Sequence, residues 1–131
     1  MVRLFSDLVE EADPGEKSAI RALQAWQFLA GKANNRQTVR YGDLANLMGY
    51  ADNRPLSSIL GHIMYFCNQN NLPPLTIIVV NKDGTPGEGF TDAVPDEFHK
   101  KREDVFLYDW FGTLPPTIQE FQEAWNVGKS N

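Results

Sequence analysis

Hydrophobic residues follow two different patterns along the chain, and each pattern predicts a type of element. In residues 16–32 the apolar side chains return every three or four positions, which is the spacing of an amphipathic helix. Similar spacing predicts a short helix over 42–50, closed by Gly49, and a longer helix over 56–71. The run "LTIIVV" at 75–80 is apolar at nearly every position, which is typical of a buried strand.

The two ends of the chain are also predicted to be helical. Residues 1–15 indicate a short arm or helix that stops at the turn sequence "DPG". Residues 96–110 place aromatic and aliphatic side chains on one side of a further helix. In the last helix, Glu120 follows Thr117 by three positions, the spacing of a capping box at a helix start.

Between these segments lie a short β-prone run and residues that predict turns. "QTVRY" is a short β-prone run before the second helix, and Asp83-Gly84 is the expected reversal point of a β-hairpin. We therefore expect a mostly helical α/β fold that is winged-helix-like, with a helix-turn-helix, a β-hairpin and added N- and C-terminal helices. One domain should span 1–131, with a winged-helix-like core at 16–90 and a C-terminal helical extension at 91–131.

Composition excludes several classes of protein. No apolar run approaches the ~20 residues that span a bilayer, and the first residues lack the features of a signal peptide. We therefore expect a cytoplasmic protein without a membrane partner. A single cysteine and two histidines cannot by themselves form a structural zinc site, so no metal is expected. The loop "DGTPGEG" has no following helix with Lys-Ser/Thr, so it predicts no bound nucleotide, and no cofactor is expected.

The charge is unevenly distributed. The net charge is −5, which by itself opposes nucleic-acid binding. Residues 70–131 hold ten carboxylates and five cations. Residues 36–69 hold three cations, Arg36, Arg40 and Arg54, and only two carboxylates, Asp43 and Asp52. The middle of the chain is therefore slightly basic.

An ordered series of short motifs within residues 38–90 resembles the DNA-binding domain of the alkylguanine-DNA alkyltransferases and the alkyltransferase-like proteins. Thr38, Tyr41, Gly42, Leu44 and Ala45 match a segment that opens the first helix of that family's helix-turn-helix. Further similarity lies in the recognition helix, the proline-rich lead into the strand and the wing, at Leu60-Gly61, at Asn71, Pro73 and Pro74, and at Asn81 to Phe90. The resemblance implies a DNA-binding fold.

The resemblance does not extend to the family's chemistry. Its reactive cysteine and neighbouring histidine align with Val79 and Val80, and neither side chain can accept an alkyl group. The family's base-extruding arginine aligns with Ser58, which is too small to fill the place of an extruded base. No alkyl transfer is therefore expected, and no catalytic residue is assigned.

Six residues are candidates for nucleic-acid contact. The polar face of the predicted recognition helix can form hydrogen bonds with bases or phosphates, and Tyr41, Arg54 and Lys82 can reach phosphates around it. The alternative for each is a solvated or packing role. The candidate set is Tyr41, Arg54, Ser57, Ser58, His62 and Lys82.

Two functions of different classes follow from these features. The leading hypothesis is a non-enzymatic nucleic-acid-binding protein on an alkyltransferase-like scaffold, with weak or structure-led DNA binding. The alternative is a protein-interaction module, an accessory or inhibitory protein whose acidic C-terminal half docks a basic partner. An enzyme that uses Cys67 is a third hypothesis, against the expectation that this thiol is packed in the core.

Overall fold

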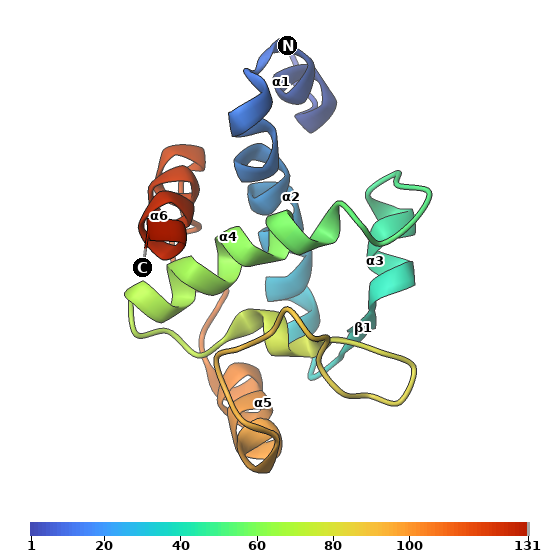
Figure 1. Ribbon diagram of the computed structural model, residues 1–131, viewed down its shortest axis with the longest axis vertical. Coiled ribbons are helices and arrows are strands. Elements are labelled where there is room, and N and C mark those ends of the chain that lie inside the picture. Colours follow the sequence, from blue (N-terminus) through green and yellow to red (C-terminus); the bar gives the residue numbers. More distant parts are fainter. Residues whose placement is uncertain (131) are drawn as a thin grey trace.

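The longest helix, α2 (Lys17–Asn34), lies at the centre of the fold because small and apolar side chains line its buried side. The computed structural model describes residues 1–130. Four of the buried positions on α2 are alanines, which let neighbouring helices approach closely. Helix α4 (Leu56–Gln69) crosses in front of α2, and helix α6 (Ile118–Ser130) packs against both (Figure 1).

The aromatic side chain of Trp26 joins these three helices. Its ring meets Phe66 of α4, Phe121 of α6 and Trp110 edge-on, at centroid distances of 6.0, 6.0 and 5.5 Å. Edge-to-face pairs of this kind add about 0.5–1.5 kcal/mol each beyond the area they bury. The hydrophobic core thus continues from α2 to residues 110 and 121, so the segment after residue 90 shares the core of the preceding residues.

The remaining helices are shorter and lie around this centre. They are α1 (Phe5–Glu11), α3 (Tyr41–Leu47) and α5 (Phe98–Leu107), with single 3₁₀ turns at Pro14–Glu16, Leu75–Ile78 and Pro95–Glu97. The predicted helices are confirmed, and Thr117 and Glu120 form the expected capping box at α6. On α3 the structure buries Leu44 and leaves Leu47 exposed.

The sheet is much shorter than the sequence predicts. β1 (Val39–Arg40) and β2 (Val79–Val80) run parallel, with Val39 opposite Val79. Burial of the whole "LTIIVV" run is confirmed, but its first four residues form the 3₁₀ turn at 75–78. β1 offers only two residues before α3 begins, so a longer β2 would bury backbone groups without partners, and the turn satisfies some of them locally.

The chain reverses after β2 as predicted, without a return strand among the described residues. Gly84 has φ +85°, and the Asn81 N–H donates to the Thr85 carbonyl at 2.8 Å. A single antiparallel bridge links Val80 to Pro86. Proline has no N–H to continue a ladder, so residues 88–90 leave the sheet and form a loop.

The described part of the chain has no helix with both the length and the hydrophobicity needed to cross a membrane.

Candidate functional site

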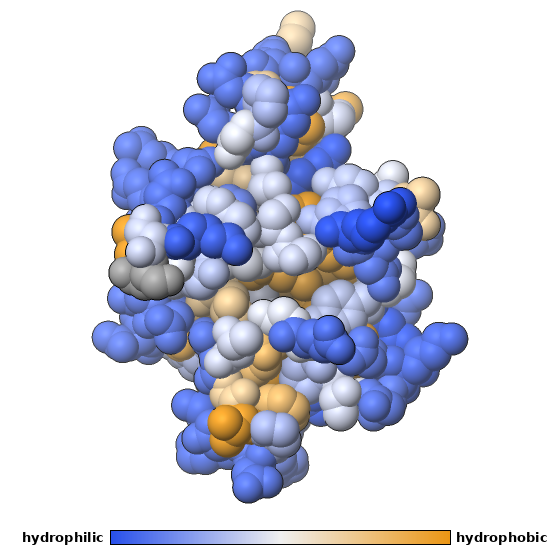
Figure 2. All heavy atoms as spheres, in the orientation of Figure 1, coloured by the Kyte–Doolittle hydropathy of each residue, from blue (hydrophilic) through white to orange (hydrophobic). Residues whose placement is uncertain are grey.

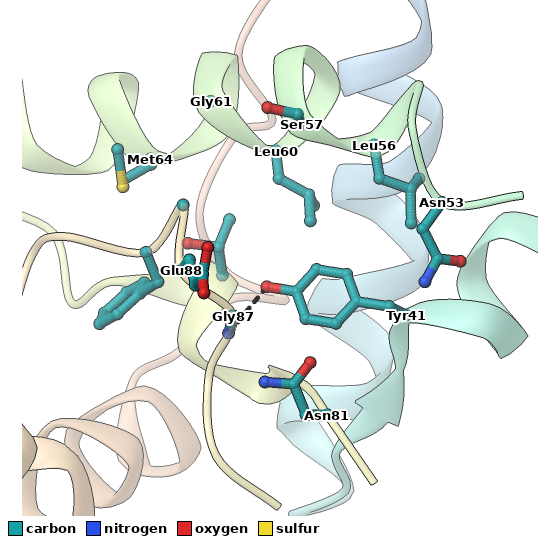
Figure 3. A pocket seen from close by; sticks show the side chains of 13 residues that line it. Tyr41, Asn53, Leu56, Ser57, Leu60, Gly61, Met64, Asn81, Gly87 and Glu88 are labelled. Atoms are coloured by element: carbon teal, nitrogen blue, oxygen red, sulfur yellow. Dashed lines mark hydrogen bonds between the residues drawn. The ribbon is translucent and has the colours of Figure 1, made fainter.

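A pocket of about 290 Å³ opens between α4, the start of α3 and the loop at 81–90. Figure 2 shows this face hollowed below α4, with hydrophobic atoms at the bottom of the hollow. In Figure 3 the ring of Tyr41 projects into the space between α4 and the loop. The lining residues are Tyr41, Asn53, Leu56, Ser57, Leu60, Gly61, Met64, Thr76, Asn81, Gly87, Glu88, Gly89 and Phe90.

Tyr41 is fixed by its contact with Gly87. The Gly87 N–H donates to the Tyr41 hydroxyl oxygen at 3.0 Å, shown as the dashed line in Figure 3. A Cβ at position 87 would collide with the Tyr41 ring and hydroxyl, so only glycine allows this approach. Burial raises the pKa of Tyr41, and the hydrogen bond from Gly87 opposes that rise. The phenol therefore stays protonated near neutral pH and can still donate its proton to a ligand.

Few charged groups line the pocket. Tyr41 and Glu88 are its titratable lining residues, and no lysine, arginine or histidine lines it. Its walls are apolar, and apart from the Glu88 carboxylate and the Tyr41 phenol its polar side chains are short amides and hydroxyls. The Thr76 hydroxyl is buried without a hydrogen-bond partner among the described residues. An unsatisfied buried hydroxyl costs stability.

Three of the sequence candidates lie at or near this pocket. Tyr41 and Ser57 line it, and Lys82 is exposed next to the lining residue Asn81. Arg54 lies near the start of α4 with its side chain 90% exposed, and it pairs with Asp52 at 2.7 Å. The guanidinium of Arg54 lowers the pKa of the Asp52 carboxyl, so the pair holds its charges at neutral pH.

The other two candidates point elsewhere. His62 was predicted to lie on the polar surface of the recognition helix, within reach of nucleic acid, but it is only 2% exposed, and its ring stacks on Trp125 of α6 at 4.4 Å. Its Nδ1 lies 2.6 Å from the Ser58 carbonyl oxygen, so Nδ1–H is the donor. The Ser58 hydroxyl is half-buried and bonds to that of Ser18 at 2.9 Å. The predicted surface role of His62 is therefore wrong, because α6 covers that side of α4.

Burial lowers the pKa of His62, while the hydrogen bond to Ser58 opposes the shift. Because the folded-state pKa lies below the unfolded value of ~6.5, the unfolded chain binds the proton more readily, so stability is lost as pH falls below about 6.5. We expect His62→Gln to remove this part of the pH dependence. Urea unfolding of both proteins between about pH 7.5 and 5 measures it. Parallel curves of unfolding free energy against pH would contradict the assignment.

No nucleophile is available at the end of β2. Val79 and Val80 stand there, and both are buried. Cys67 is fully buried on α4, and burial raises the pKa of its thiol to about 12, which leaves almost no thiolate near neutral pH. Among residues 1–130 no group of three or more His, Cys, Asp or Glu side chains is arranged to hold a metal ion.

The basic residues of the middle segment and the neighbouring Lys82, four cations in all, are not all free. Arg36 pairs with Glu103 of α5 at 2.8 Å and also lies over the ring of Phe106. Within the described chain Arg40 and Lys82 have no ion-pair partner. Two of the four cations are thus already neutralised in the folded protein.

Neither the known protein-family models, nor the curated proteins, nor the solved structures include a match to this chain.

Proposed function

We propose that this chain is a non-enzymatic nucleic-acid-binding protein whose pocket receives one unstacked base. The observation that carries the proposal is the convergence of Tyr41 and Ser57 on one pocket, beside the loop that bears Lys82. The resemblance of residues 38–90 to a DNA-binding domain supports the same function. Some residues of these motifs, among them Tyr41, Leu60 and Gly61, also line the pocket.

The chemistry of the pocket suits a nucleobase. A base is flat and uncharged, and it carries hydrogen-bonding groups along its edges. Leu56, Leu60 and Met64 offer apolar contact, while Tyr41 supplies an aromatic ring. Stacking of a base on an aromatic side chain contributes about 1–3 kcal/mol. Asn53 and Asn81 supply polar groups to the base edges.

Phosphates would remain outside the pocket, at the exposed cations around its mouth. Arg40 precedes Tyr41, Lys82 follows Asn81, and Arg54 adjoins the start of α4. Because Arg54 already pairs with Asp52, few charges are free to neutralise phosphates, so binding should be weak.

Unpaired strands are the preferred ligand under this proposal. Extruding a base from an intact duplex costs a few kcal/mol, and the cost is least for a base that is already unpaired. Ser58 is bonded to Ser18 and offers no large side chain to fill a gap in a duplex. The absence of a thiolate near the pocket supports binding without alkyl transfer.

Lys82→Ala should reduce the dependence of affinity on salt. Each lost phosphate contact flattens the log–log salt slope by about 0.7 for a single strand. Arg54→Ala should flatten it less, because Asp52 already neutralises that guanidinium. Fluorescence anisotropy of a labelled single strand across a salt series measures the slopes.

Lys100→Ala is the matched control, since Lys100 pairs with Asp104 on α5. Equal slopes for the parent protein, Lys82→Ala and Lys100→Ala would show that Lys82 does not contact a phosphate of the strand.

A protein-interaction module is the second candidate, and one ion pair favours it. Glu103 of α5 neutralises Arg36, so a carboxylate from the acidic half covers one of the middle cations. On this hypothesis the exposed carboxylates of residues 70–131 contact a basic partner. A folded protein that binds neither single strands nor duplexes at low salt would favour this candidate.

A further inference from the structure

The wall of the pocket opposite α4 is the loop at 81–90. Its end is anchored in the core, because Phe90 is buried and its ring meets that of Phe98 on α5 at 6.1 Å. The residues before Phe90 include three glycines, and glycine loses more conformational freedom on ordering than any other residue. A single backbone bridge, from Val80 to Pro86, links them to β2. Contacts from other elements are therefore needed to hold this wall in place.

Two side chains outside the loop form hydrogen bonds with it among the described residues. Tyr41 of α3 accepts the bond from the Gly87 N–H that fixes its ring. Arg102 of α5 donates from Nη2 to the Gly84 carbonyl oxygen at 2.8 Å. A bond from a charged donor is stronger than one between neutral groups. The loop is thus tied to α3 on one side and to α5 on the other.

The guanidinium of Arg102 is half-buried and has no carboxylate partner within the described chain. The next two carboxylates on α5, Glu103 and Asp104, pair with Arg36 and Lys100. Nε of Arg102 is buried without a hydrogen-bond partner among residues 1–130, which costs stability. A methionine of similar length would avoid that cost. The stability of the fold is therefore a poor reason for an arginine at this position, and its bond to the loop is a better one.

We propose that Arg102 is a positioning residue for the pocket lined by Tyr41, because it ties the loop to α5 and so keeps the 87–90 wall opposite α4. This role rests on the proposed function, since it concerns the binding of an unstacked base in that pocket. Without the Arg102 bond the ligand itself must order the loop, and the cost of that ordering weakens binding. Arg102 acts through the loop and contacts neither the base nor a phosphate.

Hydrogen exchange of the loop amides tests this tie without any nucleic acid. Arg102→Met keeps the aliphatic stem and removes the charge and the donors, so the Gly84 and Gly87 amides should exchange about threefold faster or more. Lys101→Met is the matched control, because it removes the same charge from the neighbouring position and Lys101 forms no hydrogen bond with the loop. Equal exchange in the parent protein and Arg102→Met would overturn the proposal.

Binding of a labelled single strand shows whether the tie serves the pocket. Across a salt series, Arg102→Met should bind about three- to tenfold more weakly than Lys101→Met, which has the same net charge. The log–log salt slopes of the two variants should be equal. Urea unfolding should find Arg102→Met about as stable as the parent protein, because the change also removes the unpartnered Nε.

Three results of the binding measurement would overturn the role of Arg102, and they differ in what they leave standing. A salt slope flattened by about 0.7 in Arg102→Met alone would make Arg102 a phosphate contact. Equal affinities for the two variants, with clear binding by the parent protein, would remove Arg102 and leave the proposed function intact. A folded parent protein that binds no strand would overturn the proposed function and this role with it, whatever the exchange rates show.

Discussion

Gly61→Leu is expected to lower the free energy of unfolding by about 1–3 kcal/mol, the usual cost of forcing extra atoms into a packed contact. A Cβ at position 61 would lie 2.7 Å from Cζ3 of Trp125, which is too close for two carbon atoms. The Trp125 ring cannot move freely away, because it stacks on His62 and adjoins Tyr65. The added side chain would therefore push α6 from α4. Urea unfolding measures the loss.

Two controls separate this clash from helix propensity. Gly31→Ala, also within a helix but in open space, should gain up to about 1 kcal/mol. Trp125→Ala removes the ring that the new side chain would meet, so Gly61→Leu should cost less free energy of unfolding in that background. The double variant should therefore lose less stability than the sum of the two single variants. Strict additivity, or a Gly61→Leu protein as stable as the parent, would rule out the close approach.

Tyr41→Ala is expected to weaken single-strand binding by about 5- to 150-fold, equivalent to the ~1–3 kcal/mol of one stacked base. The substitution removes the aromatic wall of the pocket and the acceptor of the Gly87 N–H. Tyr41→Phe keeps the ring, so most of the affinity should remain. Anisotropy titrations of the three proteins under one salt condition give the comparison.

Stability and binding must be measured together for this pair. Tyr41→Phe leaves the Gly87 N–H without its partner, which should cost about 1 kcal/mol of stability. If Tyr41→Phe loses as much affinity as Tyr41→Ala, the hydroxyl and not the ring is the important group. If neither changes affinity and both are folded, the pocket does not bind the strand.

The two longest helices, α2 and α4, were predictable because each of them has a buried side of regular spacing. Ala19, Trp26 and Leu29 on α2, and Ile59 and Ile63 on α4, are all buried at positions that the sequence pattern selects. The sheet was less predictable. An apolar run shows that residues 75–80 are buried, but its length says nothing of how many partner residues β1 can offer.

The candidate site depended on contacts between distant parts of the chain. Tyr41 and Ser57 were identified from local motifs, and both line the pocket. His62 was misplaced because Trp125, 63 positions later, packs over it. Spacing along α4 cannot show which of its polar residues another helix will cover. Thr76 was missed for a different reason, since one hydroxyl within an apolar run gives no signal of its own.

The proposal that an unstacked base enters the pocket is tested most directly by comparing two DNA duplexes that differ at one position. One duplex is fully paired, and the other carries a single unpaired base at its centre, with the same length and charge. We expect the unpaired duplex to bind at least tenfold more tightly, about 1.4 kcal/mol, and Tyr41→Ala to abolish that preference. Equal affinity for the two duplexes, or binding to neither by a folded protein, would contradict the proposed function.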